Sequence, residues 1–212
     1  DGLFGFARAI GIEQRIISWD IPLSDADLAF ADSTCGATPT LVISPCSSQR
    51  FRNFRNWQPD CFAEVADYAI SRYGLQIVLS GGATSFETEF SQEIEKSMKG
   101  AATNLVGKTT LKQLLALLQR AKGLVAPDSG PLHMANAVGT PIIGLYATSN
   151  PARTGPYHFQ NLVVNCYPQA LREFTRISET EARWGQRVRN PAAMELITPA
   201  AVQEKLDRLM TG

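Results

Sequence analysis

The residues best suited to bind a ligand lie in one short segment, Asp128-Ser-Gly-Pro-Leu-His-Met-Ala135. An apolar run leads into Asp128, and the proline that follows is typical of the first turn of a helix. The first backbone N–H groups of such a helix have no partner within it and carry a partial positive charge, which suits a diphosphate. Gly130 would leave room for the ligand, while Ser129 and His133 would donate hydrogen bonds to it.

The same spacing also has a purely structural interpretation. Asp128 and Ser129 are good capping residues, so they could serve only to begin the helix. His133 could then be an interior residue with satisfied hydrogen bonds. Spacing alone does not decide between capping and ligand binding.

Strands and helices must hold this segment in position, and the rest of the chain shows alternating strand and helix patterns. Short apolar runs, typical of buried strands, occur at 41–44, 76–80, 104–106, 123–126, 141–146 and, more weakly, 162–164. Helical patterns occur at 60–73, 85–99, 110–121, 131–138 and 199–210. This alternation predicts an α/β fold, a Rossmann-like parallel sheet with helices on both faces.

In such a sheet, ligands bind at the carboxyl ends of the strands. The unusual residues of the chain fall at these positions, in the segments 45–48, 80–82, 128–130 and 148–151. Residues 1–38 appear as a lead-in, with a short apolar helix near 3–10 and then a polar connection. The stretch 170–189 is polar and predicts a solvated helix or extension.

Composition excludes several classes of function. Hydrophobic residues make up 44% of the 212-residue chain, and 20 basic residues balance 20 acidic ones, so no basic excess indicates nucleic acid as a partner. The four cysteines show no C-x-x-C spacing and there are only two histidines, which argues against a metal site. Scattered cysteines fit a reducing, cytoplasmic compartment, and no apolar run approaches the roughly 20 residues of a membrane span.

The segment that begins at Asp128 resembles the signature of glycosyltransferase family 9, the ADP-heptose:lipopolysaccharide heptosyltransferases. That signature is D-[ST]-G-P-x-H-x-A-x-A-x-G-x-P, followed by a strand ending in Gly-Leu-Tyr or Gly-Leu-Phe. The chain supplies its positions as Asp128, Ser129, Gly130, Pro131, His133, Ala135, Ala137, Gly139, Pro141 and Gly144. The resemblance covers roughly residues 40 to 165.

The resemblance extends to a basic loop after the first strand. Ser47 and Ser48 stand in a loop similar to the one that contacts phosphate in the family, and would be hydroxyl donors. Arg55-Asn-Trp57 stands where the family has Lys-x-Trp, so a guanidinium able to make bidentate contacts replaces an ammonium. Arg50 and Arg52 in the same loop are alternatives to Arg55, and Trp57 by itself is better explained as a core residue.

Three further positions are implied by the family pattern. Thr109, in a segment similar to the family's G-x-[TS]-[SD]-L element, would either contact adenine or cap the following helix. Glu87 or Glu89, after a glycine pair, would lie near the ribose, although a solvated helix face explains both equally well. Thr148 opens a loop that would lie beside the donor sugar, and for Thr154 in that loop a rigid connection is the preferred explanation.

The resemblance implies the C-terminal, donor-binding half of a GT-B glycosyltransferase. Residues 39–212 would be the nucleotide-sugar-binding domain, and 1–38 the remnant of an N-terminal domain with the interdomain connection. The family pattern implies inverting transfer from ADP-heptose to a lipopolysaccharide core acceptor at the cytoplasmic face of the inner membrane, with peripheral membrane association and no cofactor or metal. In that pattern the N-terminal half would hold the acceptor. The general base would lie in an N-terminal half that this chain does not contain, so we expect the chain alone to bind ADP weakly and to transfer nothing.

Two other functions remain open at this point. One is a noncatalytic nucleotide-binding module, and the other is a GT-B transferase or epimerase with a different nucleotide sugar. Binding measurements with ADP-heptose, ADP and UDP would distinguish them.

Overall fold

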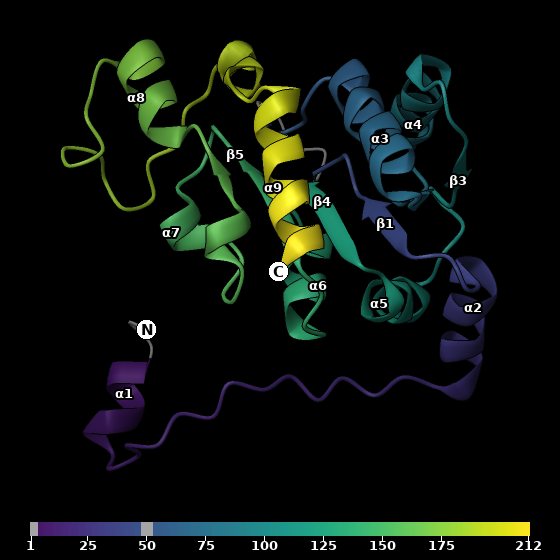
Figure 1. Ribbon diagram of the computed structural model, residues 1–212. Coiled ribbons are helices and arrows are strands. Elements are labelled where there is room, and N and C mark those ends of the chain that lie inside the picture. The colour runs from purple at the N-terminus through teal and green to yellow at the C-terminus, as the bar shows by residue number, and fades with distance from the viewer. Residues whose placement is uncertain (1–3, 48–52) are drawn as a thin grey trace.

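The computed structural model describes residues 4–47 and 53–212, and a parallel sheet forms its centre (Figure 1). The six strands follow the order β3-β2-β1-β4-β5-β6. They are β1 (Thr40–Ile43), β2 (Gln76–Leu79), β3 (Ala102–Asn104), β4 (Gly123–Pro127), β5 (Ile142–Tyr146) and β6 (Val164–Asn165). All neighbouring pairs are parallel. This is the order of a dinucleotide-binding sheet, in which the chain changes direction of winding between β1 and β4 and opens a crevice there.

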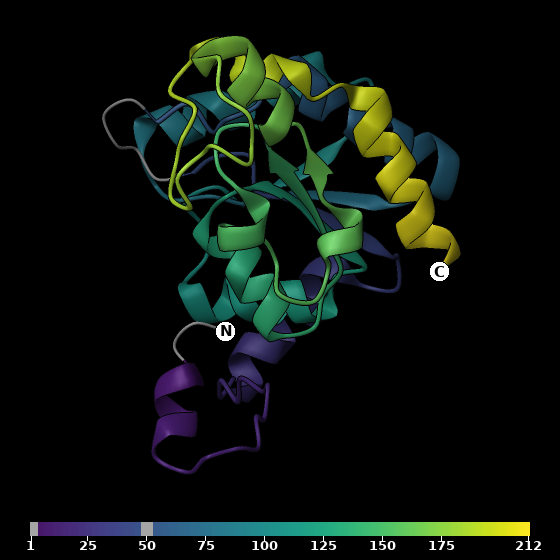
Figure 2. The ribbon, with the colours of Figure 1, turned by 90° about the vertical axis from the view of Figure 1, so that its left-hand side faces the viewer.

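Helices cover both faces of the sheet (Figures 1 and 2). One face packs against α3 (Pro59–Tyr73), α4 (Ser85–Ser97), α8 (Tyr167–Thr175) and α9 (Pro199–Thr211), and the other against α2 (Asp25–Cys35), α5 (Leu111–Arg120) and α6 (Gly130–Ala137). The short helices α1 (Phe4–Ala9), α7 (Pro151–Thr154), η1 (Gln160–Leu162) and η2 (Pro191–Leu196) complete the chain.

The central strands are buried at every residue, which is why they appear in the sequence as continuous apolar runs. Leu41 and Ile43 pack into the core on one face of the sheet, and Val42 into the core on the other. Trp57 is 1% exposed, packs edge-on against Phe62 and donates from its indole Nε1 to the Ile197 carbonyl at 2.9 Å. The interpretation of Trp57 as a core residue is therefore confirmed.

The expected elements are present, with corrections at the edges of the sheet. β3 begins two residues earlier than expected and ends at Asn104, and β6 begins at Val164 after a short 3₁₀ turn. Residues 25–35, expected within a polar connection, form α2 instead. Its capping box joins Ser24 and Asp27, with the Asp27 N–H donating to the Ser24 hydroxyl at 3.2 Å.

The N-terminal segment runs along one side of the domain before α2 begins (Figure 1). It touches the domain through Trp19, whose ring lies edge-on to Tyr157 and His158. Lys112 on α5 also donates a hydrogen bond to the Pro22 carbonyl. Within the two described ranges, no helix is both long and apolar enough to cross a membrane.

Candidate active site

A pocket of about 310 Å³ lies at the carboxyl ends of β1, β2 and β4. It therefore occupies the crevice at which a parallel sheet of this order binds ligands. Its walls are the loops after four strands and the N-terminal turns of α4, α5 and α6, made by Ser44, Cys46, Ser47, Gly81, Gly82, Glu87, Thr109, Thr110, Leu111, Leu114, Ser129, Gly130, Pro131 and Met134. Ser47, Glu87, Thr109, Ser129 and Gly130 are thus brought together as the sequence predicted.

The N-terminus of α6 forms one wall of this pocket. Ser129 is the N-cap residue by its extended backbone, but its side chain makes no capping hydrogen bond. Its hydroxyl is buried and has no hydrogen-bond partner among the residues that the structure describes. A methyl group added at Gly130 would meet no atom within 4 Å, so the backbone here is open to the pocket. Unpaired amide groups, an unpartnered hydroxyl and an open backbone make a site suited to an anion.

Asp128 does not cap the helix either, so the capping interpretation of both residues is wrong. Its carboxylate accepts a hydrogen bond from the Ser149 hydroxyl at 2.9 Å and lies 3.4 Å from Nη1 of Arg55. The same Nη1 donates to the Asp128 carbonyl at 2.9 Å. Both side chains of the ion pair are nearly buried, at 12% and 8% exposed. Arg55 therefore fixes the loop that leads into α6, which orients the amide groups of the helix.

Asparagine side chains hold the loop after β1 in place. The side-chain Oδ1 of Asn56 accepts from both the backbone N–H and the hydroxyl of Ser47, at 2.9 and 3.0 Å. Asn53 donates to the Ser47 hydroxyl at 2.6 Å and accepts from Nε of Arg55 at 2.8 Å. Ser47 thus lines the pocket with its hydroxyl already hydrogen-bonded, and one network joins it to the Asp128 loop.

Glu87 supplies the carboxylate of the opposite wall. It accepts from the Gly82 N–H at 2.5 Å and is half-buried, whereas Glu89 is exposed and does not line the pocket. Cys46 lies in the same pocket, where burial and the nearby Glu87 charge raise the pKa of its thiol to about 12. The thiol therefore stays neutral at physiological pH, and adds no charge that would repel an anion.

Thr109 lines the pocket and does not cap the helix behind it. The N-cap of α5 is Thr110, whose hydroxyl accepts from the Gln113 N–H at 3.1 Å, while the Gln113 side chain accepts from the Thr110 N–H at 2.9 Å. The capping alternative for Thr109 is therefore wrong, and its side chain remains at the wall of the pocket.

Four predicted residues do not line this pocket: Arg55 and Asp128, which form the ion pair described above, and His133 and Thr148. His133 is exposed on α6, so the interpretation of it as an interior residue is wrong. Thr148 is buried at the end of β5, where its carbonyl accepts from the Val188 N–H at 3.0 Å. Ser48 lies outside the described residues, as do Arg50 and Arg52.

Sequence reasoning missed Asn53, Asn56, Cys46 and Ser149. Asn53 and Asn56 flank the basic residue Arg55, and their polarity in a loop that follows a buried strand is a signal that could have identified them. Thr154 has the structural role that the sequence favoured, that of a residue in a rigid connecting loop. Its carbonyl accepts a hydrogen bond from the Tyr146 hydroxyl at 2.7 Å. Over the described ranges, no group of three or more His, Cys, Asp or Glu could hold a metal ion.

A family model and a related sequence both link this chain to heptosyltransferases. The sequence model of glycosyltransferase family 9 (heptosyltransferase) matches residues 2–182. A lipopolysaccharide core heptosyltransferase of Haemophilus influenzae is 35% identical over 211 residues, which are 99% of this chain and 59% of that protein.

Solved structures share the fold. A family 9 glycosyl transferase from Veillonella parvula superposes with a TM-score of 0.74 at 24% identity, covering 97% of this chain and 58% of the other. The Escherichia coli ADP-heptose lipopolysaccharide heptosyltransferase II superposes with a TM-score of 0.69 at 24% identity, covering 93% and 55%. This chain spans little more than half the length of each of these proteins.

Proposed function

The chain belongs to glycosyltransferase family 9, and on that premise we propose that it is the donor-binding half of a heptosyltransferase. In this proposal the 310 Å³ pocket at the ends of β1, β2 and β4, called the donor pocket below, binds ADP-heptose, and the complete enzyme transfers the heptose, with inversion, to a lipopolysaccharide core acceptor. The α/β fold, with its Rossmann-like parallel sheet, is that expected of the C-terminal half of a GT-B glycosyltransferase.

The observation that carries the donor assignment is the buried, unpartnered hydroxyl of Ser129 at the N-terminus of α6. Leaving a buried hydroxyl without a partner costs about 1–3 kcal/mol. A diphosphate oxygen bound at the helix N-terminus would accept from this hydroxyl and from the neighbouring amides, which would recover that cost.

The other walls of the pocket suit the remaining parts of a nucleotide sugar. Glu87 can accept hydrogen bonds from ribose hydroxyls, and Thr109 lies beside the apolar Leu111 and Leu114, where an adenine ring can pack. Arg55 acts through Asp128 by fixing the loop into α6. His133 and Thr148 do not line the pocket, so in this proposal they would contact only the sugar part of the donor and not its nucleotide.

The proposed reaction is a displacement at the anomeric carbon. The acceptor oxygen forms a bond to that carbon while the bond to the diphosphate oxygen breaks, and ADP leaves with the electron pair. The acceptor proton passes to a general base that we assign to the N-terminal half of the family architecture. Preorganised amides and hydroxyls would stabilise the charge on ADP, an effect typically worth several kcal/mol. We place this reaction at the cytoplasmic face of the inner membrane, where a lipid-linked acceptor is presented.

Titration calorimetry with ADP-heptose, ADP and UDP tests the donor assignment. We expect ADP and ADP-heptose to bind this chain and UDP to bind at least about tenfold more weakly, because a difference of 1.4 kcal/mol in base contacts gives that factor. Binding of none of the three would indicate a noncatalytic module, and a preference for UDP would indicate another donor. Heptose transfer by the chain alone would contradict the placement of the base.

A further inference from the structure

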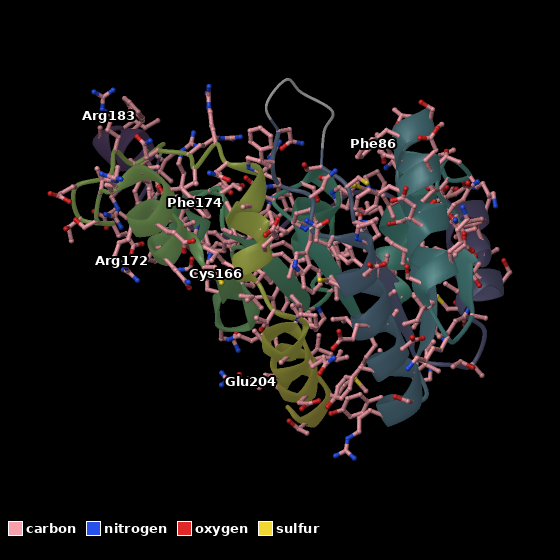
Figure 3. The ribbon with its side chains drawn as sticks, turned by 90° about the horizontal axis from the view of Figure 1, so that it is seen from above. Phe86, Cys166, Arg172, Phe174, Arg183 and Glu204 are labelled. Carbon is pink, nitrogen blue, oxygen red and sulfur yellow. The ribbon has the colours of Figure 1, made fainter. Side chains whose placement is uncertain are left out.

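A second pocket, of about 800 Å³, lies between α7 and the end of α8. We call it the arginine pocket, because it is lined by Arg153, Phe174, Thr175, Arg183, Gly185, Gln186, Arg187, Val188, Arg189 and Asn190. Seen from above, Arg183 and Phe174 lie on the α8 side of the molecule, and Phe86 of α4 lies on the other (Figure 3). The arginine pocket shares no lining residue with the donor pocket.

The charge of this pocket is one-sided. Four of its lining residues are arginines and none is acidic, although the chain as a whole has a net charge of zero. All four arginines are exposed, and none forms an ion pair with a carboxylate in the described part of the chain. The nearby Glu181 carboxylate accepts hydrogen bonds from Ser178 instead, at 2.6 and 2.8 Å. Four guanidinium groups around a cavity, none of them ion-paired within the described ranges, form a site for a phosphate-bearing ligand.

The backbone that carries the arginines is held in place. Arg187 pairs with Ser149 in an antiparallel bridge, and the Val188 N–H donates to the Thr148 carbonyl at 3.0 Å. The buried Tyr167 hydroxyl donates to the Gln186 carbonyl at 2.9 Å. The guanidinium of Arg153 lies beside Gly185, where an added Cβ would be in ordinary van der Waals contact with its Cζ atom at 3.8 Å. A fixed frame lowers the entropy lost when a ligand binds.

Ser149 links the two pockets. Its backbone pairs with Arg187, and its hydroxyl donates to Asp128 at the donor site at 2.9 Å. The arginine pocket thus begins at the loop that follows β5, on the same edge of the sheet as the N-terminus of α6. Trp184, in the same segment as Arg183, is 64% exposed and offers an aromatic face that a sugar ring can cover.

We infer that the arginine pocket binds the phosphate groups of a phosphorylated saccharide, and thereby adds a contact from this half to a phosphate-bearing acceptor glycan that the N-terminal half would hold. The guanidinium groups take the phosphates and Trp184 takes a sugar ring. The phosphate-binding site stands on the arginines alone, while its role in holding the acceptor rests on the proposed function.

The test is binding of a deacylated, phosphate-bearing lipopolysaccharide core oligosaccharide, compared with the same oligosaccharide after alkaline phosphatase treatment. We expect the phosphorylated form to bind at least about tenfold more tightly, and the double variant Arg183→Gln/Arg189→Gln to remove most of that difference. The matched control, Arg172→Gln/Lys96→Gln, loses the same charge at exposed positions outside the pocket and should bind as the unchanged chain does.

Two further measurements make the outcome decisive. Binding to vesicles of phosphatidylglycerol in phosphatidylcholine should be the same for both double variants, and a loss specific to the pocket variant without loss of oligosaccharide binding would overturn the saccharide assignment in favour of a lipid headgroup. Equal oligosaccharide binding by the pocket variant and the unchanged chain, or an equal loss in the control, would overturn the site itself. ADP affinity reports on the donor site separately, so a chain that binds the oligosaccharide but not ADP would contradict only the proposed function.

Discussion

Ser129 is one of two buried serines whose hydroxyls have no hydrogen-bond partner in the described ranges. Burying such a group costs stability, and most proteins satisfy it. Ser129 lines the pocket at the ends of β1, β2 and β4 and is the N-cap of α6, so a diphosphate bound as proposed would supply the missing acceptor. The Ser129 hydroxyl would therefore both destabilise the free protein and strengthen diphosphate binding.

Ser129→Ala should separate these two effects. Removing an unpartnered hydroxyl should leave the free energy of unfolding unchanged or raise it by up to about 1 kcal/mol, while ADP affinity falls about three- to tenfold. Urea unfolding and calorimetry measure the two quantities. Ser91→Ala is the matched control, because the buried Ser91 hydroxyl donates to the Thr88 carbonyl at 2.8 Å and accepts from Asn104 at 3.0 Å. It should lose stability and keep its ADP affinity. Lower stability with unchanged affinity in Ser129→Ala would show a structural hydroxyl.

Two neighbouring glutamates offer a second test at this scale. Glu87→Gln keeps the shape of the side chain but replaces the carboxylate, which would accept hydrogen bonds from the ribose hydroxyls, with a neutral amide. ADP affinity should therefore fall about five- to tenfold. Glu89→Gln, on the same helix but outside the pocket, should leave it unchanged. If both variants bind ADP equally well, the ribose lies elsewhere.

At the scale of elements, α5 supports the pocket through its first turn. Thr110 and Gln113 satisfy each other's backbone N–H groups, and this capping box fixes Thr109 and Leu111 at the pocket wall. The helix then buries Leu114, Leu117 and Leu118 against the sheet. Loss of the capping box should therefore lower both the free energy of unfolding and the affinity of the pocket for its ligand.

Thr110→Ala should lower the free energy of unfolding by about 1 kcal/mol and also weaken ADP binding. Thr198→Ala removes an equivalent cap from α9, where the hydroxyl accepts from the Ala201 N–H at 3.3 Å, away from the pocket. It should lose similar stability without any change in affinity. Equal ADP affinity in the two variants would mean that the first turn of α5 does not shape the site. Thermal or urea unfolding and calorimetry provide the measurements.

Some strands and helices could be predicted from the sequence and others could not, and their burial explains the difference. β1, β4 and β5 are buried at every residue, so their apolar runs identified them. β3 lies at the edge of the sheet and none of its residues is fully buried, so its pairing with β2 rests on backbone hydrogen bonds that leave no apolar pattern. α2 was missed because only Ala31 and Cys35 are buried in it, too few for a helical stripe.

The candidate site was predictable to the same degree. The position of a loop at a strand end follows from the fold, and this brought Ser47, Glu87, Thr109 and Ser129 to one pocket. Some contacts of the site, however, join residues that lie far apart in the sequence. Arg55 meets Asp128 across 73 positions, and no local pattern indicates such a contact.

At the scale of the whole molecule, the packing of α2 bears on where the domain built on the parallel sheet begins. A boundary between residues 38 and 39, predicted from the sequence, places α2 in the connection. In the structure α2 packs against α5, and Arg120 donates to the Gly36 carbonyl at 3.0 Å and to the Asp32 carboxylate at 3.3 Å. Gln76, at the start of β2, donates to the Thr34 carbonyl at 3.0 Å.

Two shortened chains distinguish these boundaries. A chain of residues 39–212 loses the buried side chains of α2 and exposes the face of α5 beneath them, so its free energy of unfolding should fall by about 2 kcal/mol or more. A chain of residues 21–212 keeps α2 and its contacts, and should unfold within about 0.5 kcal/mol of the full chain, since it loses mainly exposed contacts. Urea unfolding followed by circular dichroism measures both. If 39–212 is as stable as the full chain, α2 belongs to the connection; if 21–212 is destabilised as well, the contacts of Trp19 with Tyr157 and His158 are part of the domain.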